Sequence, residues 1–242
     1  MGRTDQDRKP AGGAGRCDGS FERAAAAQGF TRIAGLDEAG RGCLFGPVYA
    51  AVVILDPRRP IRGLNDSKQV PAAERERLAV LIRDQAAAWA VAWAAADEID
   101  RVNIYQASRL AMTRAVEQLS PPPDYLLVDA LKLDLPLAQE SLVHGDARCE
   151  SIAAASIIAK VARDAVMREW DRRYPRYGLA RNKGYGTAEH LRALKQFGPT
   201  PYHRRSFAPV RAAAGASPLA KVVRPPASGS ERGLFEEAAG AS

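Results

Sequence analysis

Acidic residues follow two apolar segments of the chain, at the point where each segment ends. Asp37 and Glu38 come directly after the apolar run 31–36, and Asp129 ends the run 124–129. Carboxylates from neighbouring strand ends repel each other unless a positive charge lies between them. Hard divalent cations fill that role, and Mg²⁺ in particular takes few protein carboxylates together with substrate phosphates. Asp146, which precedes a long helical segment, is the expected fourth ligand, so these acids indicate a two-metal phosphoryl-transfer site.

Other interpretations of these acids and of the neighbouring glycines stay open. An Asp-Glu pair at a strand end can be two solvated turn residues. Gly40-Arg41-Gly42 with Gly46 nearly matches the dinucleotide-binding fingerprint, but the preceding acids would repel a pyrophosphate. The sequence has no GxxxxGK[ST], GxSxG or HExxH pattern, which sets aside P-loop enzymes, serine hydrolases and zinc proteases. What the glycines do offer is close approach of the backbone to a sugar or a phosphate.

Basic residues are concentrated in one part of the chain. The 35 Lys and Arg against 28 Asp and Glu give a net charge of +7, and residues 163–205 alone hold eleven basic and four acidic residues. This concentration suits a polyanionic partner, because neutralised phosphates release their counterions. On charge alone, a solvated helix face is an equally good interpretation. A basic nucleic-acid-binding module without catalysis would share the same feature.

The composition indicates one globular domain with a tail at each end. Of 242 residues, 46% are hydrophobic and 26% charged, as in soluble globular proteins. Residues 1–30 are predicted to be a flexible tail and 211–242 a disordered one, because neither shows a sustained period. That leaves 31–210 as the domain that carries the acids. The apolar run 43–55 is too short to span a membrane, and three cysteines without a CxxC pair favour the cytoplasm.

Strands and helices are predicted to alternate along this domain. Apolar or β-branched runs predict strands over 31–36, 48–55, 89–95, 124–129 and 141–144. Apolar residues at helical spacing predict helices over 71–87, 103–119, 151–170 and 188–197. The order of these elements indicates an α/β fold with a mixed central sheet, flanking helices and a helical C-terminal part. A doubly wound Rossmann topology is the alternative.

A series of motifs in this order resembles the ribonuclease HII family. The first motif is GLDEAGRG at 35–42, followed by Leu44 and by Gly46-Pro47-Val48. The others are LNDSK at 64–68, LVD at 127–129, GD at 145–146, SIAAASIIAKV with Arg163-Asp164 at 151–164, NKGYGT with His190 at 182–190, and HRRSF at 203–207. Together they span about residues 32–210, and both predicted tails lie outside them.

This resemblance implies the ribonuclease H fold and a metal-dependent endonuclease. The family's catalytic, metal-binding acids map onto Asp37, Glu38, Asp129 and Asp146. Family members hydrolyse the RNA strand of RNA–DNA hybrids and nick 5′ to ribonucleotides embedded in duplex DNA. The cofactors implied are two Mn²⁺ or Mg²⁺ ions, and the products carry 5′-phosphate and 3′-hydroxyl ends. A monomer without a membrane partner is expected.

The resemblance also implies substrate-binding residues. Gly40, Arg41 and Gly42 map onto the segment that contacts the ribonucleotide 2′-hydroxyl through its backbone. Tyr185 maps onto the tyrosine that senses the junction between RNA and DNA. For Lys68, the resemblance favours a contact with a phosphate of the substrate over a solvated side chain. The sequence departs from the common family residues at Cys43, Phe45, Ala130 and His144, none of which is an acid of the set. Another nuclease or integrase of the same fold, which would also cleave all-DNA duplex, is a further alternative.

Overall fold

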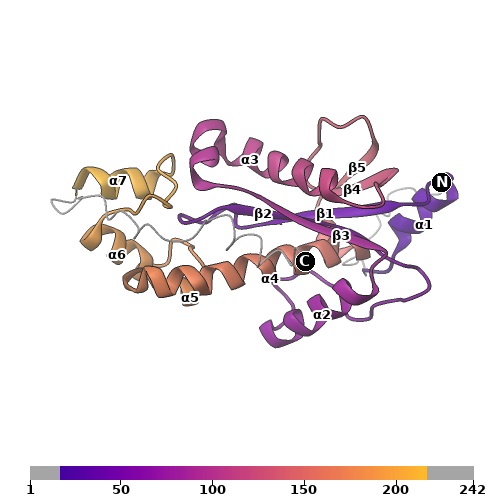
Figure 1. Cartoon of the computed structure of the whole chain (residues 1–242), viewed down its shortest axis with the longest axis horizontal. Helices are drawn as coiled ribbons and strands as arrows, with labels where there is room; N and C mark the ends of the chain where they lie inside the picture. The colour runs from indigo at the N-terminus through magenta and orange to yellow at the C-terminus, as the bar shows by residue number, and fades with distance from the viewer. Residues whose placement is uncertain (1–16, 217–242) are drawn as a thin grey trace, which may run out of the picture.

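The protein, described by a computed structural model for residues 17–216, contains a five-stranded sheet in the order β3–β2–β1–β4–β5 (Figure 1). The strands are β1 (Ile33–Ala39), β2 (Val48–Ile54), β3 (Ala88–Ala94), β4 (Tyr125–Asp129) and β5 (Ala138–Leu142). β1, β2 and β3 form an antiparallel meander, whereas β4 and β5 run parallel to β1 and β4 respectively. The mixed sheet confirms the predicted fold class. The antiparallel meander is incompatible with the doubly wound alternative.

Helices cover both faces of the sheet. On β2, Tyr49, Ala51 and Val53 pack in the core shared with α4 (Glu150–Arg173) and α2 (Ala72–Gln85). The residues between them, Ala50 and Val52, pack in the core shared with α3 (Ala96–Gln118). Figure 1 shows α3 on one side of the sheet and α4 with α2 on the other. Because every residue of β2 is buried, this strand is apolar throughout rather than alternating.

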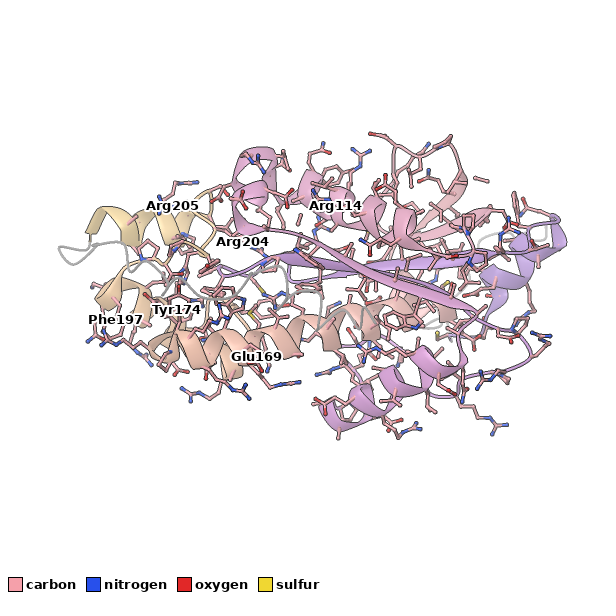
Figure 2. The ribbon with its side chains drawn as sticks, in the orientation of Figure 1. Arg114, Glu169, Tyr174, Phe197, Arg204 and Arg205 are labelled. Carbon is pink, nitrogen blue, oxygen red and sulfur yellow. The ribbon has the colours of Figure 1, made fainter. Side chains whose placement is uncertain are left out.

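The C-terminal part is helical, as predicted. The chain continues from α4 into the short helices η2 (Pro175–Tyr177) and α5 (Leu179–Asn182), and then into α6 (Ala188–Phe197) and α7 (Ala208–Ala216). Figure 2 shows Tyr174 and Arg204 in this part of the molecule, whereas Arg114 lies over the sheet at α3. Within residues 17–216, none of the helices is both long and apolar enough to cross a membrane.

The prediction of a flexible tail over residues 1–30 is wrong for its second half. Residues 20–27 form helix α1 (Ser20–Ala27), with Ala25 buried against the start of α4. The Glu22 carboxylate accepts hydrogen bonds from the Ser151 N–H and hydroxyl, both at 2.7 Å. The Phe30 and Tyr125 ring centroids lie 4.6 Å apart. An eight-residue helix with a single buried face is too short to show a period. The first 16 residues lie outside the described part.

Several element boundaries also differ from the predictions, among them that of the strand predicted over 31–36, which is β1 and extends to Ala39, so that Asp37 and Glu38 lie within it. The helix predicted over 103–119 begins at Ala96 and is interrupted at Asn103, whose left-handed backbone (φ 69°) allows its Oδ1 to accept from the Gln106 N–H at 3.0 Å. The strand predicted over 141–144 is β5, an edge strand over Ala138–Leu142 whose residues are mostly polar and exposed. Helix α7 includes residues 211–216 of the predicted C-terminal tail, and residues 217–242 lie outside the described part.

Candidate active site

The four predicted acids come from three segments that meet at one end of the sheet. β1 and β4 are parallel and paired as far as Leu36 and Val128, so the next residue of each strand carries a carboxylate. The N–H of Gly145 donates to Oδ1 of Asp129 at 2.8 Å, which brings the neighbouring Asp146 to the same edge. The sequence analysis expected these acids at neighbouring strand ends, and the parallel pairing of β1 with β4 brings them to the same edge.

Close backbone packing fixes the segment that carries Asp146. A Cβ atom on Gly35 would lie 2.1 Å from the backbone of Ser151, so only glycine lets β1 approach the first turn of α4. A Cβ atom on Gly145 would lie 2.6 Å from Cδ1 of Ile152. The helix η1 (Gly145–Ala147) is therefore held between β4 and α4.

Burial and mutual repulsion raise the pKa values of these acids. Burial raises the pKa of Asp37 well above its usual range, and the charges of Glu38 and Asp129 raise it further. Burial likewise raises the pKa of Glu38, with Arg41 as the main opposing charge. The pKa values of Asp129 and Asp146 are also raised, first by burial. Each acid is thus less stable in its charged form than a free carboxyl, which is typical of functional sites.

Two cations lie against the acids. Nη1 of Arg41 is 3.3 Å from Oε1 of Glu38, and Nζ of Lys68 is 3.3 Å from Oδ2 of Asp146. The side chain of Lys68 is 75% exposed, so its ammonium group lies at the surface above the buried Asp146. These two contacts neutralise part of the negative charge but leave the set of four acids with an excess of it.

The donor chemistry of the site fits divalent cations. Oε2 of Glu38 is buried and has no hydrogen-bond partner among the described residues, although buried carboxylate oxygens are ordinarily satisfied. Across residues 17–216, no three Asp, Glu, His or Cys side chains form a ready-made metal-binding group. Like-charged carboxylates would hold one another apart until a cation lies between them. An unpartnered oxygen within an acidic, partly buried set is therefore what a Mg²⁺ or Mn²⁺ site requires.

Ser156 of α4 connects the site to the loop before Lys68. Its Oγ donates to Oγ of Ser67 at 2.7 Å, and its side chain opposes the rise in the pKa of Asp37. On the same helix, Nζ of Lys160 lies 2.6 Å from Oδ1 of Asp164, an i, i+4 pair. Ser156 thus links the loop before Lys68 to the strand that carries Asp37.

The three residues of the Gly-Arg-Gly segment have different environments. Gly40 is buried with a φ of 98°, and a Cβ atom on it would lie 2.1 Å from Nε of Arg163. Its carbonyl accepts from the Cys43 N–H at 3.3 Å. Gly42, by contrast, is exposed. Gly40 is therefore required by the packing of the loop, and Gly42 is the residue of the segment that is open to a nucleic acid.

Tyr185 lies beside Gly42. The two segments are joined by a β-bridge between Cys43 and Tyr185, and Leu44 N–H donates to the Gly184 carbonyl at 2.8 Å. The Tyr185 side chain is 41% exposed, and a Cβ atom on Gly42 would lie 3.9 Å from its Cε1. The exposed edge of this tyrosine and the backbone of Gly42 form one continuous surface.

Sequence reasoning missed two buried arginines that hold this surface in place. Arg163 and Arg204 are almost completely buried. The Arg163 guanidinium group donates to the backbone carbonyls of Pro47, Phe45 and Lys183. The Arg204 guanidinium group donates to the backbone carbonyls of Gly46 and Arg41. Burial lowers the pKa of Arg204 to about 9, so it is still charged at neutral pH. Both arginines belong to the basic segment 163–205, and the density of charge in that segment predicts side chains that are exposed to solvent.

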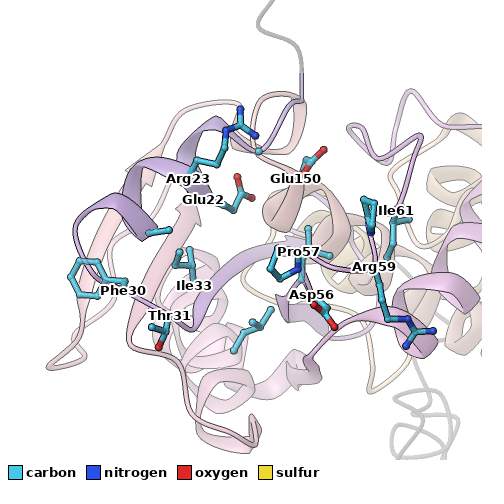
Figure 3. Close-up of a pocket in the computed structure, with 15 residues that line it drawn as sticks. Glu22, Arg23, Phe30, Thr31, Ile33, Asp56, Pro57, Arg59, Ile61 and Glu150 are labelled. Carbon is cyan, nitrogen blue, oxygen red and sulfur yellow. The ribbon is translucent and has the colours of Figure 1, made fainter.

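A separate pocket of about 630 Å³ lies away from the acids. Figure 3 shows Glu22 and Arg23 of α1 on one side and the segment from Asp56 to Ile61 on the other. The pocket is lined by the start of β1 and the end of β2, so it lies toward the opposite end of β1 from Asp37. None of the four acids lines this pocket.

Solved structures share this architecture. The crystal structure of ribonuclease H2 from Pyrococcus horikoshii OT3 is similar with a TM-score of 0.66 and 27% identity, covering 76% of this chain and 98% of that chain. Bst-RNase HIII in complex with Mn²⁺ has a TM-score of 0.58 at 21% identity, covering 76% and 69%, and shows the fold alone. The sheet and the helices on its two faces define the class as a protein of the ribonuclease H fold.

The particular family follows from closer relatives. The family model described as Ribonuclease HII matches residues 34–210. Ribonuclease HII of Solibacter usitatus (strain Ellin6076) is 59% identical over 203 residues, covering 84% of this chain and 89% of that protein. Ribonuclease HII of Koribacter versatilis (strain Ellin345) is 56% identical over 195 residues, covering 81% and 77%. The chain belongs to the ribonuclease HII family, which confirms the resemblance found in the sequence.

Proposed function

We propose that this protein hydrolyses the RNA strand of RNA–DNA hybrids and incises duplex DNA 5′ to embedded ribonucleotides, using two divalent cations held by Asp37, Glu38, Asp129 and Asp146. The observation that carries this proposal is the buried, unpartnered Oε2 of Glu38 within an acidic set at the sheet edge. A protein that only bound nucleic acid would gain nothing from acids beside the phosphate, since they would weaken binding.

Each residue of the site has a distinct part in this reaction. The four acids supply the negative charge that holds Mg²⁺ or Mn²⁺, and such ions lower the pKa of the attacking water and stabilise the leaving oxygen. Lys68 is exposed beside Asp146 and is placed to contact a phosphate of the cleaved strand. Arg41 keeps Glu38 oriented through its 3.3 Å contact. The products expected are 5′-phosphate and 3′-hydroxyl ends.

The choice of RNA over DNA is assigned to the Gly42–Tyr185 surface. A protein distinguishes the two by contacting the 2′-hydroxyl, which can both donate and accept. The exposed backbone at Gly42 allows such contact without a side chain in the way. The Tyr185 ring beside it would stack on the following sugar, where a second 2′-hydroxyl would crowd the ring. This arrangement favours a junction at which one ribonucleotide is followed by DNA.

The proposal is tested with a DNA duplex that contains a single ribonucleotide. We expect one nick 5′ to the ribonucleotide when Mg²⁺ or Mn²⁺ is present, and no nick when EDTA removes the cation. A matched all-DNA duplex of the same sequence should stay intact. Binding without a metal-dependent nick would favour a non-catalytic binding module, and cleavage of the all-DNA duplex would favour another nuclease of the same fold.

A further inference from the structure

Two histidines outside the acidic site form a buried pair. His190 of α6 and His203 are fully buried, and their Nε2 atoms lie 3.0 Å apart. Each uses its other ring nitrogen as well: Nδ1 of His190 lies 2.9 Å from the carbonyl oxygen of Tyr185, and Nδ1 of His203 lies 3.0 Å from the backbone N–H of Thr200. The pair therefore connects Thr200 to the residue assigned to junction sensing.

The chemistry of the end groups fixes the proton positions. A carbonyl oxygen can only accept, so Nδ1 of His190 carries a hydrogen. A backbone N–H can only donate, so Nδ1 of His203 is unprotonated. A neutral imidazole has one N–H, which leaves Nε2–H of His203 to donate to the bare Nε2 of His190. Donors thus run in one direction, from Thr200 through His203 and His190 to Tyr185, and every ring nitrogen is satisfied.

The surroundings favour this neutral state. Burial lowers the pKa of His203 well below its usual range, with the charge of His190 as a second cause. Burial also lowers the pKa of His190, although its hydrogen bond to the Tyr185 carbonyl and then the charge of Glu189 oppose the effect. The ring of His203 lies between Phe45 at 4.9 Å and Tyr177 at 5.0 Å, centroid to centroid. A proton added to Nε2 of His190 would face the Nε2–H of His203, and a proton added to Nδ1 of His203 would face the Thr200 N–H.

This chain of hydrogen bonds, called the relay below, ends at the Tyr185 carbonyl, whose segment is also joined to the Gly42 loop by the bridge to Cys43. The Tyr185 N–H donates to the Asn182 carbonyl at 2.9 Å, and its carbonyl accepts from the Thr187 N–H at 2.8 Å. Both of these contacts are local to the turn. The His190 contact is the one described hydrogen bond that ties the Tyr185 carbonyl to a helix packed in the core, through a partner that is itself held by residues 200–203.

We propose that His190 and His203 are positioning residues for substrate choice: through directed hydrogen bonds they hold the Tyr185 backbone so that its ring meets the sugar after an embedded ribonucleotide. This inference rests on the proposed function of Tyr185. It concerns cleavage at a single ribonucleotide in DNA and not the metal site, because neither histidine contacts an acid of the site. The hydrolysis of all-RNA hybrids should depend much less on the relay.

Amide substitutions test the direction of the relay. The Asn side chain places its amide nitrogen where Nδ1 of histidine lies, and the Gln side chain places its amide where Nε2 lies. His190→Asn should keep the donor to Tyr185, whereas His190→Gln should lose it. At position 203 the order is reversed, because His203→Gln keeps the donor to His190 and His203→Asn does not.

The expected result is a crossed pattern. Cleavage at a single ribonucleotide should fall about 10-fold in His190→Gln and His203→Asn, as for one lost buried hydrogen bond, and about 2- to 3-fold in the other two variants. Cleavage of an all-RNA hybrid should stay within about 2-fold of wild type in all four. A purely structural role would lower cleavage of both substrates equally, so the crossed pattern must be confined to the single-ribonucleotide duplex. Asn and Gln ranking the same way at both positions, or equal losses on both substrates, would overturn the inference.

Tyr185→Ala, assayed in parallel, separates this inference from the proposed function. If Tyr185→Ala leaves substrate preference unchanged, the role proposed for Tyr185 fails. If it changes preference while the crossed pattern is missing, only the relay fails. Adding His190→Gln to Tyr185→Ala should cause no further loss of preference, because both act through the same ring.

Imidazole ¹⁵N chemical shifts of the wild-type protein give a readout that needs no variant to fold. At neutral pH we expect His190 as the Nδ1–H tautomer and His203 as the Nε2–H tautomer. The reverse tautomers, or a charged ring at either position, would contradict the relay.

Discussion

The acidic edge of the sheet and the buried basic scaffold under the Gly42–Tyr185 surface both bury ionisable groups, but the hydrogen bonding of those groups differs. At the acidic edge, burial and then repulsion between the carboxyls raise the pKa values of Asp37 and Glu38, and Oε2 of Glu38 has no partner among the described residues. In the scaffold, Arg163 donates to three backbone carbonyls and Arg204 to two, with only Nη2 of Arg204 left without a partner among the described residues, and His190 and His203 hydrogen-bond each other. The acids keep an excess of like charge, whereas the scaffold is held mainly by hydrogen bonds within the fold.

This difference is consistent with a catalytic role for the acidic edge and a positioning role for the scaffold. A region with uncompensated charge is less stable than it could be, which is expected of a site that must bind something. A region whose buried donors are mostly hydrogen-bonded within the fold holds its shape when no ligand is bound, which is expected of a surface that must discriminate between similar sugars. Substitutions in the two regions should therefore have opposite effects on stability.

The largest effect is expected from Asp129→Asn, which should lower cleavage of a hybrid by about 10²–10³-fold or more. Asparagine keeps the shape and can still accept from the Gly145 N–H, but it removes a charge from the metal-binding set. Binding of the hybrid should persist. Single-turnover cleavage and fluorescence anisotropy with a labelled hybrid measure the two properties. Normal turnover by this variant would remove Asp129 from the site.

Arg163→Met should lower the free energy of unfolding by about 2–4 kcal/mol, because buried carbonyls lose their donor. The matched control is Arg172→Met on the same helix, whose side chain is 76% exposed and pairs with Glu169. A surface pair contributes about 0–1 kcal/mol. Denaturant unfolding of both variants decides the matter, and equal losses would mean that the buried guanidinium does not support the loop.

Tyr185→Ala should reduce cleavage at a single embedded ribonucleotide by about 10-fold, as expected for a lost stacking contact, without unfolding the protein or removing its metals. Tyr105→Ala on α3 is a suitable control, because that side chain is similarly exposed, 44% against 41%. Rates on single-ribonucleotide and all-RNA substrates should diverge only for the Tyr185 variant. Wild-type activity of that variant on the single-ribonucleotide duplex would make Tyr185 a packing residue.

The smallest effect is a gain in stability. Because the folded state raises the pKa of Asp37, the charged form is disfavoured in the fold, and stability is lost as the pH rises above about 4. In metal-free buffer at pH 7, Asp37→Asn should therefore raise the free energy of unfolding by about 0.5–2 kcal/mol. The gain should shrink as the pH falls toward 4. Asp134→Asn, at an 89% exposed carboxylate, is the control; a loss of stability in Asp37→Asn would contradict the comparison.

The sequence was sufficient to predict the helices and strands that have a clear hydrophobic period, and the acids that follow apolar runs. The helix over 188–197 agrees with α6, and the strands over 48–55 and 89–95 agree with β2 and β3 to within one residue at each end. The grouping of Asp37 with Asp129 was predicted from the position of both acids at the ends of apolar runs, whereas the parallel pairing of β1 with β4 was not predicted. These features depend on local composition, which a single sequence shows directly.

The remaining features depend on contacts between distant segments. β5 is a polar edge strand that has no apolar period, and α1 is specified by packing against Ser151 and Tyr125 rather than by its own pattern. Arg163 and the His190–His203 pair are polar residues that become buried only because loop carbonyls and ring nitrogens meet them across the fold. No local rule marks such residues as buried.

The central claim is that the four acids remain uncompensated until divalent cations bind. Calorimetric titration of Mn²⁺ into the metal-free wild type and into Asp129→Asn, in two buffers of different protonation enthalpy, tests it most directly. The wild type should bind Mn²⁺ with release of protons, because carboxyls with raised pKa values must lose them on binding. Asp129→Asn should bind at least about 10-fold more weakly. Equal Mn²⁺ affinity in the two proteins would contradict the claim.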